Sequence, residues 1–446
     1  MKIERYVASS FAALDSDVHA GGGTDDTAAI QAVLDKAKDA ETGVYLVMDG
    51  AALVSHLRLY SNTTIECLSK DCGFYQIGGS DTSIVTNAVQ DRYRIQTRNV
   101  SLIGGTYNQN CLHQAHDTPA GWTIGIEFYG ISDLLVRDAT ISEFRTFALT
   151  VGGFRNITFE NVWFDMKHHM MGNQDGFHFW GPGQYLTVRN CGGCVSDDIM
   201  NIGPDEVDGH SDITDVLVDG LFLDDAEQGV RLLSRGSGRL DRVTIRNVTG
   251  QYRSFGFYIN PWFPSEKCGG SFGSILIENV DLKEHPRTYP YREPFLFSVG
   301  GNIDCLTLKN IRHHNGHDPR VLFEFGLPFY SSYAAPIDEK SSEHTQRIKT
   351  VILDGLTVIE DEDDPEGRTV VRLYDSVENM VIKNAVVLKK QSEPNGSFLE
   401  FRYLGHIGRL ISDSVYIDGV GTVCSDASRI GKVFGPAFWE QDKDCP

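Results

Sequence analysis

Basic residues are scarce in this chain, because 40 Lys and Arg stand against 61 Asp and Glu among 446 residues. The formal net charge of −21 creates a field that repels nucleic acid and anionic membranes, so we expect neither as a partner. The same field disfavours polyanionic glycans unless a local basic pocket compensates. Apolar runs of about 18 or more residues are also absent, which excludes a membrane-spanning helix.

The sequence also lacks a secretory signal and an even set of cysteines. The first residues, MKIERYVASSFAALDSD, contain no continuous apolar stretch. We therefore expect a cytoplasmic protein, with a secreted protein whose signal has been removed as the alternative. Nine scattered cysteines fit buried reduced thiols better than a disulfide framework. The one CxxC, at Cys191 and Cys194, has no second pair at zinc-finger spacing, so we interpret both as core or turn residues.

Helical periodicity is confined to residues 21–40, GGGTDDTAAIQAVLDKAKDA. Thr24 is the expected N-cap, and the apolar residues repeat with the spacing of one helix face. That expected stripe consists of Ile30, Val33, Leu34 and Ala37. Strand-like segments follow at 44–47, 57–59 and 63–67. A short helix ahead of many strands indicates a cap on a stack of strands.

A repeat dominates the remaining sequence. Each unit alternates apolar and polar residues, reaches an Asn or Asp, and continues with a second short strand, as in ITFENVWF and VTIRNVTG. The ten Asn or Asp positions are 138, 161, 190, 219, 247, 279, 310, 354, 384 and 413. This pattern predicts an all-β fold, a single-stranded right-handed parallel β-helix with a short N-terminal capping helix. We expect one domain over 1–446, with a cap at about 1–60, coils at about 61–425 and a tail at 426–446.

The stretch 173–203, NQDGFHFWGPGQYLTVRNCGGCVSDDIMNIG, carries the most informative acids. Asp175 precedes the first of two strand-like runs, and Asp197 and Asp198 follow the second. Because Asp197 lies 22 positions after Asp175, about one solenoid turn, we expect the three carboxylates side by side on adjacent coils. An isolated Asp-Asp pair is usually a solvated turn, but acids that converge and are partly buried have raised pKa values. Such a group can protonate a leaving group and activate a water.

Three motifs form a set: NQDG at 173–176, DD at 197–198 and GVRLL at 229–233. They are similar to the Asn-Thr-Asp-Gly, Asp-Asp and Gly-Ile-Arg-Ile-Lys motifs of the family-28 glycoside hydrolases, the polygalacturonases and their relatives. That family belongs to the pectate-lyase-like β-helix superfamily. Residues 11–37 resemble the opening of many such enzymes, and Gly209-His210-Ser211 loosely echoes the family's Gly-His-Gly.

The resemblance implies a glycoside hydrolase that cleaves a plant or microbial polysaccharide or oligosaccharide by inversion. Asp197 would be the general acid, and Asp175 and Asp198 would hold the attacking water, with opposed carboxyl groups roughly 6.5–9.5 Å apart. We expect no cofactor and no metal. The expected substrate-binding residues are Asn173, His178, His210, Arg231 and Trp262.

Leu233 departs from the family pattern, because it stands where the family has a lysine that recognises the galacturonate carboxylate. We therefore favour a neutral or mixed glycan over plain polygalacturonate, although Arg231 keeps an acidic sugar possible. Aromatic residues suited to stacking on sugars are Trp180, Tyr258, Trp262 and Phe263.

The adjacent histidines His168 and His169 precede the Asp175 motif. Because neighbouring side chains diverge, we interpret them as part of a loop lining the cleft rather than as a metal pair. Other functions compatible with the fold are a polysaccharide lyase, an intramolecular glycosyl transferase or epimerase, and a non-catalytic glycan-binding β-helix. The sequence does not specify an oligomeric state.

Overall fold

The computed structural model describes residues 2–39, 41–119, 121–261, 270–286, 294–314, 321–326, 347–361, 368–390 and 395–443. Strand accounts for 63% of the structure and helix for 6%. The chain forms two compact units, which are described separately below. Unit 1 comprises residues 1–202 and 217–226, and unit 2 comprises 203–216 and 227–446. Assignment of the whole chain to one domain stays a prediction.

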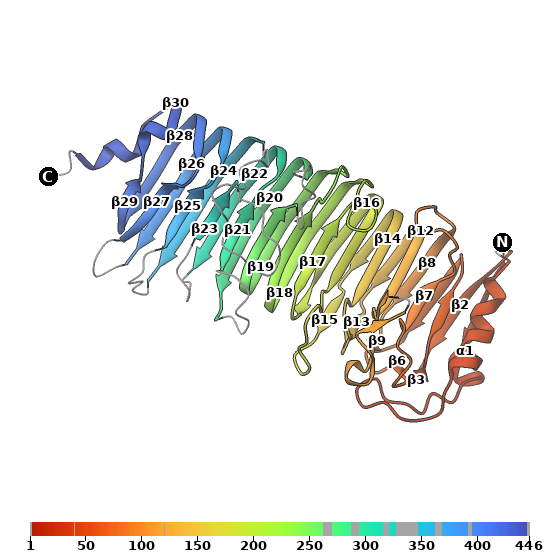
Figure 1. Cartoon of the computed structure of the whole chain (residues 1–446). Helices are drawn as coiled ribbons and strands as arrows, with labels where there is room; N and C mark the ends of the chain where they lie inside the picture. Colours follow the sequence, from red (N-terminus) through yellow and green to blue (C-terminus); the bar gives the residue numbers. More distant parts are fainter. Residues whose placement is uncertain are drawn as a thin grey trace. The chain divides into compact units, whose positions relative to one another are not determined.

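Unit 1 begins with the capping helix α1 (Thr27–Leu34), which continues as the short 3-10 turn η2 (Asp35–Ala37) and is drawn in red in Figure 1. All four residues of the expected apolar stripe are buried, so this prediction is confirmed. The expected N-cap was wrong, because the backbone and hydroxyl of Thr24 donate to the carboxylate of Asp15 instead. Asp26 is the N-cap residue.

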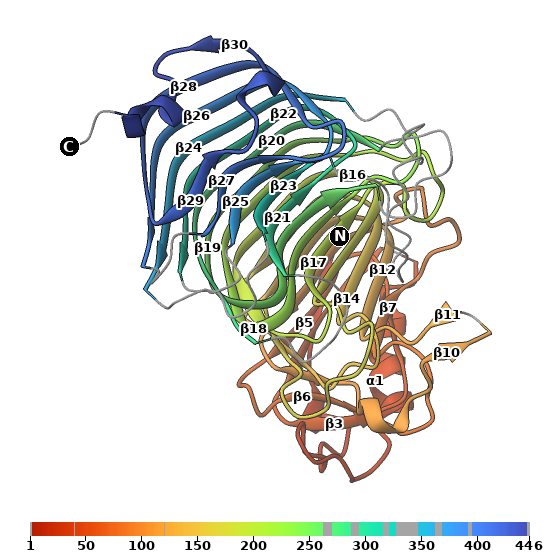
Figure 2. The same cartoon turned by 60° about the vertical axis from the view of Figure 1, so that its left-hand side comes forward.

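The coils of unit 1 consist of short parallel strands that pair with the strands one coil away. Three ladders are formed: β1–β2–β5–β8–β12–β14–β16, β3–β6–β9–β13–β15–β16 and β4–β7–β12. The antiparallel hairpin of β10 and β11 stands off these coils (Figure 2). The strands and remaining short helices are β1 (Lys2–Val7), η1 (Ala8–Ser10), β2 (Thr42–Met48), β3 (Ala51–Val54), β4 (Leu57–Leu59), β5 (Thr63–Cys67), β6 (Gly73–Gln76), β7 (Val85–Asn87), β8 (Thr97–Ile103), β9 (Thr106–Asn108), η3 (Cys111–His113), β10 (Asp117–Thr118), β11 (Gly121–Trp122), β12 (Ile126–Arg137), β13 (Thr140–Ser142), β14 (Leu149–Glu160), β15 (Trp163–Asp165), β16 (Phe177–Cys194) and β17 (Asp198–Gly203).

Unit 2 repeats this construction with two parallel ladders, β19–β20–β22–β24–β26–β28–β30 and β19–β21–β23–β25–β27–β29. Because β30 pairs with β28, parallel pairing continues beyond residue 425, where we expected the coils to end. The remaining elements are β18 (Ile213–Leu233, with residues in both units), β19 (Leu240–Asn260), β20 (Ser271–Glu284), β21 (Phe295–Val299), β22 (Asn302–His314), β23 (Val321–Phe325), β24 (Ile348–Glu360), β25 (Thr369–Leu373), β26 (Ser376–Lys389), β27 (Asn395–Phe401), β28 (His406–Asp418), β29 (Val420–Cys424), η5 (Ala427–Arg429), β30 (Ile430–Phe434) and η6 (Phe438–Lys443).

The repeated Asn and Asp mark a corner of the coils where the backbone enters the left-handed region, at seven positions on the repeated residue itself and after Asp219, Asp354 and Asp413 on the next residue. Asn247, Asn279 and Asn310 have φ values of 60°, 57° and 51°. Asn and Asp tolerate this conformation better than other residues with a Cβ atom, which explains the repeat. The amide of Asn279 donates to the side-chain oxygen of Asn247 at 3.2 Å, and that of Asn310 donates to Asn279 at 3.0 Å. The predicted fold class is therefore confirmed.

Seven cysteines fall in the described part of the chain, and all are free thiols. Five of them are buried, as the sequence predicted, while Cys305 and Cys424 are half-buried. Cys268 and Cys445 lie outside the described residues. No helix among the described residues is long and apolar enough to cross a membrane.

Candidate active site

The three expected carboxylates converge in unit 1. Asp175 lies just before β16, and Asp197 and Asp198 lie at the start of β17. The backbone N–H of Gly176 donates to the carbonyl of Asp198 at 2.8 Å, which holds the two segments on adjacent coils. One oxygen of each carboxylate lies within 4.8 Å of the others. The convergence inferred from the 22-residue gap is thus present in the structure.

This separation reflects the spacing of the coils. Adjacent strands of a sheet lie about 4.8 Å apart, so acids at one position of successive coils are held close together. The 4.8 Å limit applies to the nearest oxygens of the three acids, whereas the roughly 6.5–9.5 Å expected for an inverting enzyme is a separation between whole carboxyl groups. Two oxygens about 4.5 Å apart can both accept from one water, since each such bond is about 2.7–2.8 Å long.

The three acids differ in exposure. Asp175 is 3% exposed and Asp198 is 2% exposed, whereas Asp197 is only half-buried. A group that protonates a bulky glycosidic oxygen must reach the surface, while groups that hold a small water need not. Burial therefore separates Asp197 from the other two acids in the way that their expected roles require.

His178, from β16, lies directly beside Asp175 and is 2% exposed. Its Nδ1 donates to Asp175 Oδ2 at 2.7 Å, because an ionised carboxylate only accepts. Its ring stacks on Phe147, with centroids 4.0 Å apart. The structure shows His178 buried and in contact with Asp175, and its expected contact with substrate stays a prediction.

Aromatic rings continue from His178 to a pocket in unit 1. Trp180 packs edge-on against His178 at 5.1 Å and stacks with Tyr129 at 6.0 Å. Gly152 pairs with Tyr129 on one neighbouring strand and with Trp180 on the other. A Cβ atom at this position would come within 2.8 Å of the Tyr129 ring, so glycine leaves room for the two rings to stack. Trp122, from the β10–β11 hairpin, packs on Phe147 at 4.9 Å.

The pocket has a volume of about 210 Å³, equal to about seven waters at ~30 Å³ each, a size that suits one sugar ring. Its aromatic walls are Trp122, Tyr129 and Trp180, and its charged groups include Arg92 and Glu127. The Arg92 guanidinium lies 4.3 Å from the centre of the Tyr129 ring. Flat aromatic faces beside a few charged groups are typical of sites that bind small polar ligands.

Two of the other expected substrate-binding residues, Arg231 and His210, belong to unit 2. Arg231 lies in unit 2, where its Nη2 donates to Gln228 Oε1 at 2.5 Å. Its guanidinium carbon is 5.5 Å from the Phe255 ring and 5.7 Å from the Tyr258 ring. His210, also in unit 2, is 72% exposed in its side chain and bonds to Asp208.

The remaining residues expected to contact substrate are Asn173, Tyr258, Trp262 and Phe263. Asn173 is half-buried in unit 1, in a left-handed turn with φ 61°, two residues before Asp175. Tyr258 is 2% exposed within an aromatic cluster, so its expected role as a stacking platform is wrong. Trp262 and Phe263 lie outside the described residues.

The pocket was missed in the sequence because its members share no period. Trp122, Tyr129 and Arg92 come from a hairpin, a strand and a turn on different coils. Trp180 was named as a stacking candidate, and a further signal was the tryptophan in the turn-rich segment HDTPAGWTIG. Such a residue has no place in a repeating core position and is a candidate for the surface.

No protein family model matches the chain, and no curated protein matches it by sequence. Solved structures do resemble it. The HK620 tailspike of an E. coli bacteriophage, solved with a pentasaccharide, has a TM-score of 0.54 and 11% identity, and the match covers 92% of this chain and 75% of that chain. The A-module of the Azotobacter vinelandii mannuronan C-5 epimerase AlgE4 has a TM-score of 0.50 and 14% identity, covering 97% and 100%. A family 28 exopolygalacturonase of Yersinia enterocolitica has a TM-score of 0.48 and 13% identity, covering 94% and 79%. At these identities the similarity concerns the fold alone.

Proposed function

We propose that this chain is a glycoside hydrolase, related to the family-28 enzymes, that cleaves a glycosidic bond in a plant or microbial polysaccharide or oligosaccharide. The observation that carries the proposal is the convergence of Asp175, Asp197 and Asp198 within 4.8 Å on adjacent coils. Three carboxylates in one place are unfavourable for folding unless their charge is used. Protonation of a leaving group and activation of a water both need positioned carboxyl groups.

The proposed reaction is a single displacement. Asp197, the most accessible of the three acids, gives its proton to the glycosidic oxygen as the bond to the anomeric carbon breaks. A water held between Asp175 and Asp198 attacks that carbon, and its proton passes to one of the two carboxylates. His178 keeps Asp175 in position through the 2.7 Å hydrogen bond. The product is then a reducing sugar with inverted configuration, which proton NMR of the fresh product identifies.

The aromatic pocket supports a carbohydrate substrate and its class. Trp122 and Trp180 offer apolar faces of the kind that pack on pyranose C–H surfaces. Arg92 lines the pocket together with Asp81 and Glu127, so one basic and two acidic side chains face the ligand. With the net charge of −21, this balance favours a neutral or mixed glycan over polygalacturonate.

The decisive experiment is turnover of a glycan panel by the wild-type chain and by Asp197→Asn. We expect Asp197→Asn to lower kcat by roughly 10²–10⁴, the usual contribution of one positioned acid or base, without loss of folding. Asp138→Asn is the matched control, because Asp138 occupies the corner position where other coils carry Asn. Unchanged turnover in Asp197→Asn on a verified substrate would remove Asp197 from the mechanism.

Product analysis separates the alternatives on the same fold. A lyase yields an unsaturated uronide that absorbs in the ultraviolet, an epimerase leaves the chain length unchanged, and a glycosyl transferase forms a new glycosidic bond. A glycan-binding β-helix would bind oligosaccharide without turnover, equally well in the wild-type chain and in Asp197→Asn. Any of these outcomes contradicts the hydrolase proposal.

A further inference from the structure

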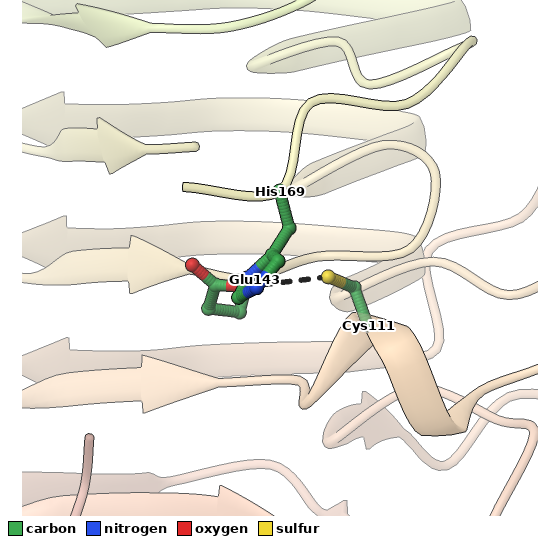
Figure 3. A group of neighbouring side chains, drawn as sticks. All are labelled: Cys111, Glu143 and His169. Atoms are coloured by element: carbon green, nitrogen blue, oxygen red, sulfur yellow. Dashed lines mark hydrogen bonds and ion pairs between the residues drawn. The ribbon is translucent and has the colours of Figure 1, made fainter. Parts of the chain in front are cut away.

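A second group of metal-ligating side chains lies in unit 1, away from the carboxylates assigned to the reaction. Cys111 begins the 3-10 turn η3, Glu143 directly follows β13, and His169 lies in the loop between β15 and β16. Figure 3 shows the three side chains pointing toward one another from three separate segments. One ligand atom of each lies within 4.8 Å of the others. The chain thus brings together a sulfur, a carboxylate oxygen and an imidazole nitrogen.

The distances are close to those of a tetrahedral zinc site. Cys111 Sγ lies 3.4 Å from Glu143 Oε2. Bonds of about 2.3 Å to sulfur and about 2.1 Å to oxygen place two tetrahedral ligands about 3.6 Å apart. His169 Nδ1 bonds directly to the same Glu143 oxygen, so binding of an ion requires this contact to widen. The backbone is already anchored, because the N–H of Cys111 donates to the carbonyl of Glu143 at 2.9 Å.

Burial decreases from the sulfur outward. Cys111 is 1% exposed, whereas the side chains of Glu143 and His169 are 18% and 41% exposed. An ion can therefore enter from the histidine side and keep a water as its fourth ligand. Burial, together with the charge of Glu143, raises the pKa of Cys111 to about 12. Without an ion, the thiol is thus protonated and donates to Glu143.

We propose that Cys111, Glu143 and His169 form a binding site for a thiophilic divalent cation of the zinc class. A ligand set of one sulfur, one nitrogen and one oxygen suits zinc and its neighbours, while calcium and magnesium require several oxygens. Binding replaces the thiol proton by a metal–sulfur bond, and the proton is released to solvent. This proposal does not depend on the hydrolase proposal, and it differs from the expectations that the chain holds no metal and that His169 only lines a cleft.

The site would fasten the loop that leads to Asp175. Only five residues separate His169 from that acid, and Gln174 already ties the loop down by donating to the carbonyl of Phe144 at 2.8 Å. An ion bound by His169, Cys111 and Glu143 would anchor the same loop to two earlier coils. The role is structural, since the ion stabilises the native loop and contacts none of the proposed catalytic acids.

The test uses the full chain and the metal alone. Cobalt(II) is added to the metal-free protein, and zinc is then titrated in competition. We expect the ultraviolet sulfur-to-cobalt charge-transfer band, its loss on addition of one equivalent of zinc, and a higher melting temperature with zinc. Absence of the band in the wild-type chain would overturn the proposal and leave a hydrogen-bonded cluster, and this result does not depend on any variant folding.

Variants then assign the ligands. Cys111→Ser and His169→Gln should each weaken zinc binding by at least about 100-fold, since loss of even an outer partner of a ligand costs 10–100-fold. His168→Gln is the matched control, because His168 is exposed and adjacent in the same loop, and Cys305→Ser controls for binding to another thiol. Asp197→Asn should leave zinc binding unchanged. Zinc binding that survives Cys111→Ser and disappears in Asp197→Asn would assign the ion to the carboxylate cluster and overturn the proposal.

Discussion

At the scale of single residues, the arrangement around Asp175 depends on a buried histidine. His178 is held on one side by the ring of Phe147 at 4.0 Å and on the other by its hydrogen bond to Asp175. A side chain that is 2% exposed contributes to chemistry through the group that it orients. We therefore regard His178 as a positioning residue in the proposed reaction.

His178→Ala is expected to lower kcat by about 100-fold, because a displacement of about 1 Å in a reacting group can have that effect. KM should change little, since the buried ring offers no surface to substrate. His178→Asn should restore most of the activity, because the asparagine amide can donate from nearly the position of Nδ1. Steady-state kinetics of both variants measures this, and a rise in KM with unchanged kcat would instead indicate a direct substrate contact.

At the scale of elements, the close approach of adjacent coils decides where the acids lie. The segment before β16 can bond to the start of β17 only because residue 176 is glycine. A Cβ atom there would meet the carbonyl oxygen of Ile199 at 2.6 Å and ring atoms of Phe164 at 2.7 Å. The backbone oxygen cannot rotate away as a flexible side chain could.

Gly176→Ala should therefore destabilise the fold by about 1–3 kcal/mol, the usual cost of an overpacked site. It should also reduce activity, because the new methyl group separates Asp175 from Asp198. Gly172→Ala is the matched control in the preceding loop, since its Cβ atom would have no neighbour within 4 Å. Thermal and urea unfolding of the two variants provides the comparison, and equal stabilities would contradict the close packing described here.

At the scale of the whole molecule, the interior of unit 2 contains charges that link its stability to pH. Arg368 pairs with Glu284 at 3.1 Å and Glu360 at 3.6 Å, and all three side chains are at most 5% exposed. His313 is buried nearby, and its Nε2 is hydrogen-bonded to the hydroxyl of Tyr252 at 3.1 Å. Burial first, and then the charges of Arg368 and His314, hold the pKa of His313 well below its usual value of 6.5.

A histidine that stays neutral in the folded chain takes up a proton only on unfolding. Below pH 6.5 the unfolded state therefore binds more protons, and the free energy of unfolding falls by up to about 1.4 kcal/mol per pH unit. His313→Gln removes the group that takes up this proton, so its free energy of unfolding should depend less on pH between about pH 6.5 and 5. This expectation concerns the slope and holds whatever the stability of the variant at pH 7. Urea unfolding across that range tests the prediction, with the exposed His168→Gln as control, and equal slopes in all three proteins would contradict it.

Much of this architecture is present in the sequence, for a local reason. The Asn and Asp repeat, as at Asn279, records a backbone corner that needs a left-handed conformation, so the repeat alone reveals the succession of coils. The gap from Asp175 to Asp197 matches one coil, so the carboxylate cluster was predictable as well. The buried apolar face of the capping helix was also predictable, because its residues repeat within one short segment of the chain.

Only the tertiary structure decided the features that depend on contacts between coils. Leu233, which stands where the resembled family has a lysine, is 1% exposed, a burial that the sequence did not predict. The aromatic pocket around Trp180, and the meeting of Cys111 with His169, likewise join segments with no common period. A one-dimensional repeat fixes the rise from coil to coil, but the loops and turns leave that period. Their side chains meet according to how far each loop extends and how it packs, which no local pattern in the sequence records.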